Sequence, residues 1–290
     1  MRARALVLAA TILAGCGSAP RLVEPPRLKA ALEAESDGAK RYGRGDYSAA
    51  ARRFDEAIRL YASIDDTPGA ARNRLHLART ELALGHAEAA LLVLAATARS
   101  SDDGFALETL LLKAQAQLAL ARTDAAQQSL AAAAGLCTAA CPQLASLNLL
   151  QARAALADQR AADALRHAES ALLLLQDKDQ AAETGNAWRF IAAARLAGGD
   201  AGGALPAARA ALGIDRQLAL PEKIARDWLL VGDIQRKAGT GDAASAYQRA
   251  LGVANAAGLA DLAAIAAQAL AEALGMRDSQ PVSQQKDGQR

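Results

Sequence analysis

The sequence predicts an all-α protein, a solenoid of about six helix pairs closed by a C-terminal capping helix. Hydrophobic residues make up 52% of the 290 residues and aromatic residues only 3%, so alanine and leucine must build the core. Alanine favours helix more than any other residue and lets neighbouring helices approach closely. Valine, isoleucine and threonine are sparse, and no sustained alternation of apolar and polar residues indicates a strand.

A repeat of nearly constant period predicts the solenoid. Six segments read as a turn followed by an amphipathic helix, and they begin at Gly45, Gly85, Ala121, Gln159, Gly199 and Gly239. An early alanine recurs in these helices at intervals of 40, 36, 38, 40 and 39 residues, at Ala50, Ala90, Ala126, Ala164, Ala204 and Ala243. Such a period indicates stacked helix pairs, each burying its apolar face against its neighbours. An irregular alanine-rich bundle would not keep a fixed phase.

The first residues have the features of a secretory signal. Arg2 and Arg4 precede a mostly apolar run over residues 5–14. Ten helical residues rise about 15 Å, roughly half the thickness of a hydrocarbon core, which is too short for a membrane span. The run ends in Leu-Ala-Gly-Cys, which resembles the lipobox of bacterial lipoproteins and implies acylation of Cys16. The alternatives are an ordinary signal peptide with a chance cysteine, or the start of a buried helix.

The lipoprotein resemblance sets the expected domain organisation and location. Residues 1–15 would be removed, residues 16–29 would form a lipidated, flexible tether, residues 30–275 the repeat domain, and residues 276–290 a disordered tail. Two or three acyl chains form a stable anchor. Glycine rather than aspartate follows the cysteine, which implies the outer membrane and its periplasmic face.

Charge gives no indication of nucleic-acid binding. The formal net charge is +2, and Arg2 and Arg4 would leave with the signal peptide, so the mature chain is expected to be nearly neutral. A basic surface of the kind that binds nucleic acid is therefore not predicted.

Two short motifs recur within the helices. One runs Trp-x-x-apolar-small and begins at Trp188 and Trp228, and the other runs Ala-x-x-x-aromatic-x-x-Ala and begins at Ala50 and Ala243. Together they resemble the tetratricopeptide repeat over about residues 30–256, with residues 259–274 as the capping helix. In such repeats a small residue on the first helix admits the bulky residue of the second. The period exceeds the usual value of about 34, so longer helices or turns are expected.

The resemblance implies a partner-binding groove, because the first helices of tetratricopeptide domains line a concave face that takes a peptide. The residues it places there are Arg72, Leu75, Arg79, Gln115, Arg153, Arg189, Arg226, Asp233 and Arg236. The same face is expected to carry Glu108, Asn186, Phe190, Leu229 and Lys237. Guanidinium forks suit carboxylates, so an acidic partner segment is one hypothesis. Ordinary solvated arginines are the alternative.

Cys137 and Cys141 are the two thiols that remain once Cys16 is acylated. Exported cysteines meet oxidising conditions, and a disulfide between these two would contribute about 2 kcal/mol through loop closure. Free thiols are an alternative, as is a metal or redox site. A metal would need further ligands, and none is close in the sequence.

No catalytic signature is present in the sequence. Its three histidines, His76, His86 and His167, fall in different repeats, and neither a zinc-protease motif, a nucleophile elbow nor a phosphate loop occurs. The sequence therefore predicts a scaffold without cofactor or metal, which binds proteins of an envelope assembly. Pilus or secretion machinery, barrel assembly, polysaccharide export and peptidoglycan synthesis are the candidate settings. A cell-wall enzyme is the alternative, as is a cytosolic adaptor if the signal peptide is not genuine.

Overall fold

The computed structural model describes residues 25–97, 105–138, 141–176 and 179–275. Within these ranges the chain forms thirteen α-helices and no strand, so the predicted all-α class is confirmed. The predicted signal peptide, Cys16 and the predicted tail lie outside the described residues. The first helix begins at Pro26, within the predicted tether, because proline is well suited to the first turn of a helix.

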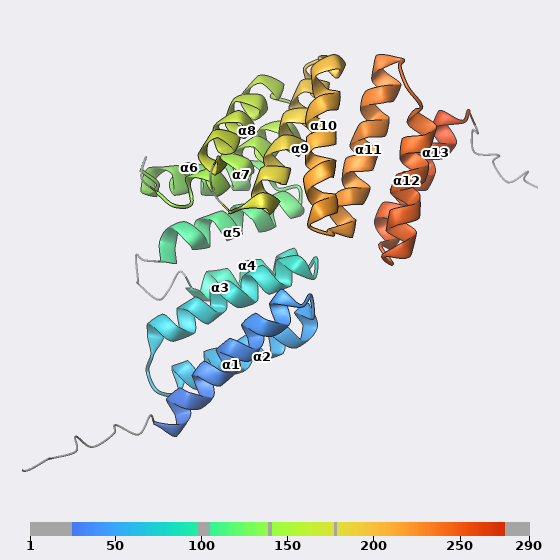
Figure 1. Ribbon diagram of the computed structural model, residues 1–290. Helices are drawn as coiled ribbons and strands as arrows, with labels where there is room; N and C mark the ends of the chain where they lie inside the picture. Colours follow the sequence, from blue (N-terminus) through green and yellow to red (C-terminus); the bar gives the residue numbers. More distant parts are fainter. Residues whose placement is uncertain (1–24, 98–104, 139–140, 177–178, 276–290) are drawn as a thin grey trace, which may run out of the picture.

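Twelve of the described helices form six consecutive hairpins, and the last helix packs on the sixth (Figure 1). The pairs are α1 (Pro26–Gly43) with α2 (Tyr47–Ala62), α3 (Thr67–Ala83) with α4 (Ala87–Thr97), α5 (Ala106–Ala119) with α6 (Thr123–Leu136), α7 (Leu144–Ala157) with α8 (Ala161–Leu175), α9 (Ala181–Ala197) with α10 (Ala201–Gln217), and α11 (Pro221–Ala238) with α12 (Ala243–Ala256). The last helix is α13 (Ala260–Ala273). This is the predicted solenoid of six pairs and a capping helix.

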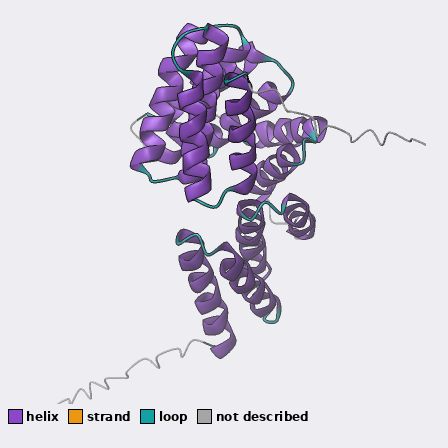
Figure 2. Ribbon diagram, turned by 90° about the vertical axis from the view of Figure 1, so that its right-hand side faces the viewer, coloured by secondary structure: helices purple, strands orange, loops and turns teal. Residues whose placement is uncertain are grey.

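The first helices of the pairs lie on one side of the stack, and the second helices lie on the other. From α3 onward each first helix packs on the next first helix, in the order α3, α5, α7, α9 and α11. The second helices do not pack on one another to a similar extent. Because elements stand closer together on the inside of a curve, the first helices line the concave side. Figure 1 shows the resulting curved stack, and Figure 2 shows the short loops that join its helices.

Each hairpin turn contains a residue with positive φ, the left-handed conformation that favours glycine. Gly45, Gly85 and Gly199 have φ values of 79°, 82° and 89°. Ala121 and Gln159 hold the same turn position in the third and fourth pairs, with φ values of 54° and 59°. The turn geometry is therefore kept even where the sequence lacks glycine.

Alanine layers form much of the core, as the composition predicts. Of the six alanines that recur with the repeat period, five are 0% exposed, namely Ala50, Ala90, Ala126, Ala164 and Ala204. The sixth, Ala243, is only half-buried, and α12 buries Ala246 in its place. Close helix packing in these layers depends on side chains no larger than a methyl group.

Bulky residues of second helices enter hollows left by glycines of first helices. Phe54 on α2 lies against Gly38 on α1, where an added Cβ would stand 2.8 Å from the ring. Tyr247 on α12 lies against Gly232 on α11, where an added Cβ would overlap the ring. The predicted pairing of small and bulky residues is thus confirmed.

No helix within the described ranges is sufficiently long and apolar to cross a membrane.

Candidate partner-binding groove

A groove of about 1050 Å³ opens on the concave side and is lined by residues of α3, α5, α7, α9 and α11. This volume exceeds that of most small-ligand pockets, which hold roughly 300–1000 Å³. Apolar lining comes from leucines of α5 and α7 and from Phe190, and amide groups come from Gln115, Gln143 and Asn186. The surface therefore offers both apolar contacts and hydrogen-bonding groups along a path that crosses five helices.

Most of the predicted groove positions lie in this groove, but not all. The lining includes Arg79, Gln115, Arg153, Arg189 and Arg226, together with Glu108, Asn186 and Phe190. It does not include Arg72, Leu75, Asp233, Arg236, Leu229 and Lys237. The predicted positions that are missing come from the first half of α3 and from the middle and end of α11.

In α3 the missing residues hold the first pairs together. Leu75 is 1% exposed within the core between α3, α4 and α5, so its predicted place on a binding face is wrong. Arg72 donates from Nε to Glu35 Oε1 at 2.7 Å and from Nη2 to Oε2 at 3.0 Å. Tyr61 donates to the same carboxylate at 2.6 Å. Arg72 therefore links α3 to α1 and does not line the groove.

In α11 the missing residues bind the neighbouring helices. Asp233 accepts a hydrogen bond of 2.8 Å from the Tyr247 hydroxyl on α12. Arg236 bonds Glu272 on α13 at 3.3 Å, and Lys237 donates to the Leu196 carbonyl at 2.8 Å. Leu229 packs against the cluster formed by α11, α12 and α13. The middle and end of α11 thus contact α9, α12 and the capping helix α13 instead of lining the groove.

Two groove arginines are paired with exposed or half-buried carboxylates from the groove itself. Arg79 on α3 pairs with Glu108 on α5 at 2.5 Å. Arg226 on α11 pairs with Glu222, one turn earlier, at 2.9 Å. These pairs leave little net charge at either end of the groove.

Arg189 is the centre of a buried network behind the groove. Its Nε donates to Asp227 Oδ1 at 2.6 Å, its Nη1 donates to Asn186 Oδ1 at 2.8 Å, and its Nη2 donates to Asp215. Both aspartates are 0% exposed. Burial raises the pKa of Asp227 to about 6, since the opposing effect of Arg189 is incomplete and the Asp215 charge adds to the rise. This arginine lines the groove, but its donors are already engaged by Asn186 on its own helix and by the two aspartates on α10 and α11.

Lys223 stands beside this network. Its Nζ donates to the Ala182 carbonyl at 3.4 Å, and burial lowers its pKa. Sequence reasoning missed Lys223, Asp215 and Asp227. Asp215 lies on the second helix α10, which the repeat phase assigns to the other side, and no local pattern marks Lys223 or Asp227 on α11.

Arg153 on α7 differs from the other groove arginines. It is half-buried and has neither an ion pair nor a hydrogen bond within the described ranges. Burial lowers the pKa of Arg153, and the nearby Arg226 charge lowers it further. The middle of the groove therefore holds a cation that no described residue neutralises.

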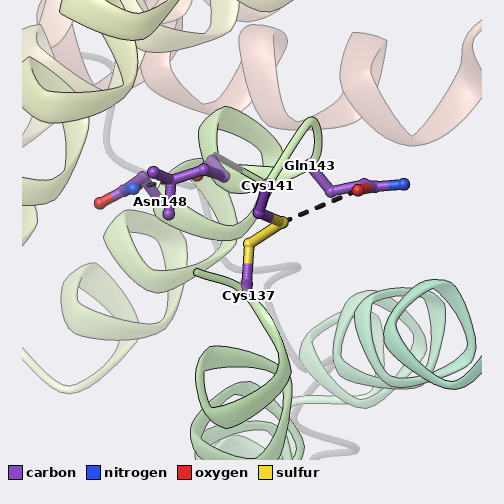
Figure 3. Close-up of a disulfide and its surroundings, with 5 residues drawn as sticks. Cys137, Cys141, Gln143 and Asn148 are labelled. Atoms are coloured by element: carbon purple, nitrogen blue, oxygen red, sulfur yellow. Dashed lines mark hydrogen bonds between the residues drawn. A yellow bond between two sulfur atoms is a disulfide. The ribbon is translucent and has the colours of Figure 1, made fainter. Parts of the chain in front are cut away.

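A disulfide joins Cys137 to Cys141 between α6 and α7, with their Cα atoms 5.2 Å apart (Figure 3). Cys141 Sγ lies 3.7 Å from Oε1 of Gln143, which lines the groove. The bond ties the end of one repeat to the start of the helix that carries Arg153.

The histidines do not form a common site. His76 stacks on Phe54 with ring centroids 5.2 Å apart, His86 pairs with Glu81 at 2.9 Å, and His167 lies 3.2 Å from Asn148. Among the described residues no group of three or more histidine, cysteine or acidic side chains could hold a metal ion.

Comparisons with known proteins show the fold. No protein-family model and no curated protein sequence matches the chain. The apo form of RapI has a TM-score of 0.62 at 11% identity, covering 84% of this chain and 71% of that one. A Rap protein complexed with competence and sporulation factor has a TM-score of 0.64 at 13% identity, covering 87% and 78%. BtubC from P. vanneervenii has a TM-score of 0.55 at 15% identity, covering 81% and 93%. These likenesses support a helical-repeat solenoid.

Proposed function

We propose that this protein is a docking scaffold that holds an extended segment of a protein partner in the concave groove. The observation that carries the proposal is the groove of about 1050 Å³ across five first helices. An extended segment needs hydrogen-bonding partners for its main chain, which Gln115, Gln143 and Asn186 supply. It also needs apolar surface for alternate side chains, which Leu150 and Phe190 supply.

The architecture supports this role, although a fold by itself does not choose a function. Stacked helical repeats present extended concave surfaces for binding. One protein of similar fold was crystallised in complex with competence and sporulation factor. That complex is a precedent for the fold, and the groove supplies the argument for this chain.

We further propose that the scaffold is anchored to the outer membrane through acylated Cys16 and acts at the periplasmic face. The basic start, the short apolar run and the lipobox-like residues support this location. The disulfide between Cys137 and Cys141 suits an oxidising compartment. The partner would then belong to an envelope assembly.

A catalytic role is not proposed. No histidine or cysteine is among the described residues that line the groove, and the Ser146 hydroxyl makes no hydrogen bond to the glutamates or to Lys223, the groups in the lining that could act as its base. Acyl transfer or hydrolysis by this hydroxyl would need a base within hydrogen-bond reach of it. Turnover of cell-wall substrates by the purified protein would favour an enzyme instead.

In-cell photocrosslinking tests the docking function. A photoreactive amino acid at Gln115 or Ser146, both exposed in the groove, is expected to capture a partner. The same group at the exposed Gln128 on α6 serves as the control on a second helix. Capture of the same protein from all three positions, or from Gln128 alone, would contradict groove binding.

Metabolic labelling with a radioactive fatty acid tests the anchor separately. The wild-type chain is expected to incorporate label and to fractionate with membranes, whereas Cys16→Ser is expected to do neither. Equal labelling of both chains, or of neither, would contradict the lipoprotein assignment while leaving the groove proposal in place.

A further inference from the structure

The arginine and lysine side chains that line the groove differ in their ion-pair and hydrogen-bond partners. Arg79 and Arg226 have glutamate partners, and Arg189 has two aspartates. Lys223 donates to a backbone carbonyl. Arg153 has no such partner within the described part of the chain. A ligand that enters the groove can therefore form an ion pair with Arg153 without breaking an ion pair that already exists.

The surroundings of Arg153 make an anion favourable there. Its groove neighbours on α7 include Leu149 and Leu150, and it is half-buried. A partly desolvated charge without a partner is costly, and Arg226 adds repulsion. A carboxylate would relieve both effects, and the planar guanidinium can bind it with two parallel hydrogen bonds.

We infer that Arg153 anchors one carboxylate of the docked segment, from an aspartate or glutamate side chain in the interior of an extended peptide. The inference rests on the proposed docking function and adds the chemical class of the occupant to it.

The position of Arg153 favours an internal acidic side chain over a C-terminal carboxylate. Arg153 lies on α7, the middle of the five helices that line the groove, and lining residues continue through α3 and α5 on one side and through α9 and α11 on the other. A chain that ended at Arg153 would leave one half of this surface uncovered.

The charges around Arg153 favour a single acidic residue. Glu108, Glu183 and Glu222 also line the groove. Glu108 and Glu222 already neutralise Arg79 and Arg226, and Arg189 is paired with two aspartates. A second or third carboxylate on the segment would find no other unpaired arginine among the described lining residues, so the residues that flank the anchor should be neutral or basic. Electrostatic complementarity of this kind sets specificity more than affinity.

Selection from a phage-displayed library of random peptides of about twelve residues, which span roughly 40 Å when extended, tests the inference. The bait is the full chain, and the peptides are fused at their C-terminal ends so that they present internal carboxylates only. The enriched peptides are expected to share one aspartate or glutamate. Enrichment of peptides without a shared acidic residue would overturn the anchor.

Binding constants of a selected synthetic peptide supply the residue-level test. Arg153→Gln in the protein and glutamate-to-glutamine in the peptide are each expected to weaken binding by about ten- to a hundredfold. The two changes together should weaken binding little further, because they remove the same contact. The matched control is Arg209→Gln, an exposed arginine on α10 that loses the same charge outside the groove, and it should leave binding unchanged.

The outcomes separate the anchor from the groove. The peptide substitution uses the unaltered protein, so a folding defect of Arg153→Gln cannot imitate its effect. Unchanged binding after either single change would overturn the anchor while docking stands. Tighter binding of a peptide whose acid is moved to a free C-terminus would overturn the internal placement. If no peptide is enriched and Ser146 crosslinks to nothing, the docking function fails as well.

Discussion

Arg189 on α9 donates a hydrogen bond of 2.6 Å from Nε to Oδ1 of the fully buried Asp227 on α11. Together with the bond to Asp215 on α10, it joins three helices directly behind the groove. The network makes the wall of the groove part of the folded core. Its contribution can therefore be measured as a change in the free energy of unfolding of the protein, without a ligand.

Loss of Arg189 should destabilise the protein strongly. Arg189→Met leaves two buried carboxylates without their cation, and breaking a buried pair in this way costs about 3–5 kcal/mol. Urea denaturation gives the free energy of unfolding. The control is Arg59→Met, which breaks an exposed pair with Asp55 and should cost less than about 1 kcal/mol. Equal losses in the two variants would contradict a buried network.

Stability should fall as pH rises through the range in which Asp227 ionises. Burial raises the pKa of this carboxyl to about 6, above its value in the unfolded chain, so the folded state holds more protons between about pH 4 and pH 6. The Asp227 contribution to the free energy of unfolding is complete below about pH 4 and is lost above about pH 6. It amounts to roughly 2–3 kcal/mol. Urea denaturation at several pH values measures it.

Asp227→Asn is the matched variant for this pH dependence. The amide keeps an acceptor for Arg189 but does not titrate, so the fall between about pH 4 and pH 6 should largely disappear. Identical pH profiles for the wild type and the variant would show that Asp227 ionises normally.

Glycine should stabilise the two hairpin turns that lack it. Ala121 and Gln159 have φ values of 54° and 59°, and a non-glycine residue pays about 1–2 kcal/mol for this conformation. Glycine loses more entropy on folding, so Ala121→Gly and Gln159→Gly should each gain roughly 0.5–1 kcal/mol. Thermal unfolding measures the gain. Gly45→Ala, at a φ of 79°, should do the reverse, and destabilisation by the two glycine variants would contradict the turn geometry.

A methyl group on Gly232 should disturb the packing of Tyr247. An added Cβ there overlaps the tyrosine ring, and overpacking of this kind costs about 1–3 kcal/mol. Gly213 on α10 is the matched control, since an added Cβ meets nothing within 4 Å. Gly213→Ala should stabilise by roughly 0.5–1 kcal/mol through helix propensity. Similar effects at both positions would contradict the predicted pairing of small and bulky residues.

The repeat architecture could be predicted because it depends on local spacing. Alanines about forty residues apart identify the helix pairs, and the motif that begins at Trp228 ends in the glycine that receives Tyr247. Turn geometry at Ala121 and Gln159 follows the same register without the expected glycine. Period and phase thus determine which helices pair.

The details of the groove could only partly be predicted, because they depend on how the stack curves. A fixed phase places Leu75 on the inner face, but α3 packs so that this residue is enclosed by α4 and α5. The partners of Arg189 are 26 and 38 residues away, and one of them lies on a second helix. No local pattern identifies such pairs. For the same reason, the sequence could not show that Arg153 has no ion-pair or hydrogen-bond partner among the described residues.

Ordered crosslinking tests the docking account most directly. A photoreactive amino acid is placed in turn at one exposed or half-buried groove position on each first helix, at Ala83, Gln115, Ser146, Asn186 and Glu222. Mass spectrometry then identifies the crosslinked peptides. We predict that the five sites capture neighbouring residues of one partner segment, in an order that follows the helices from α3 to α11. Crosslinks scattered over unrelated proteins, or over distant parts of one protein without order, would contradict a segment held in the groove.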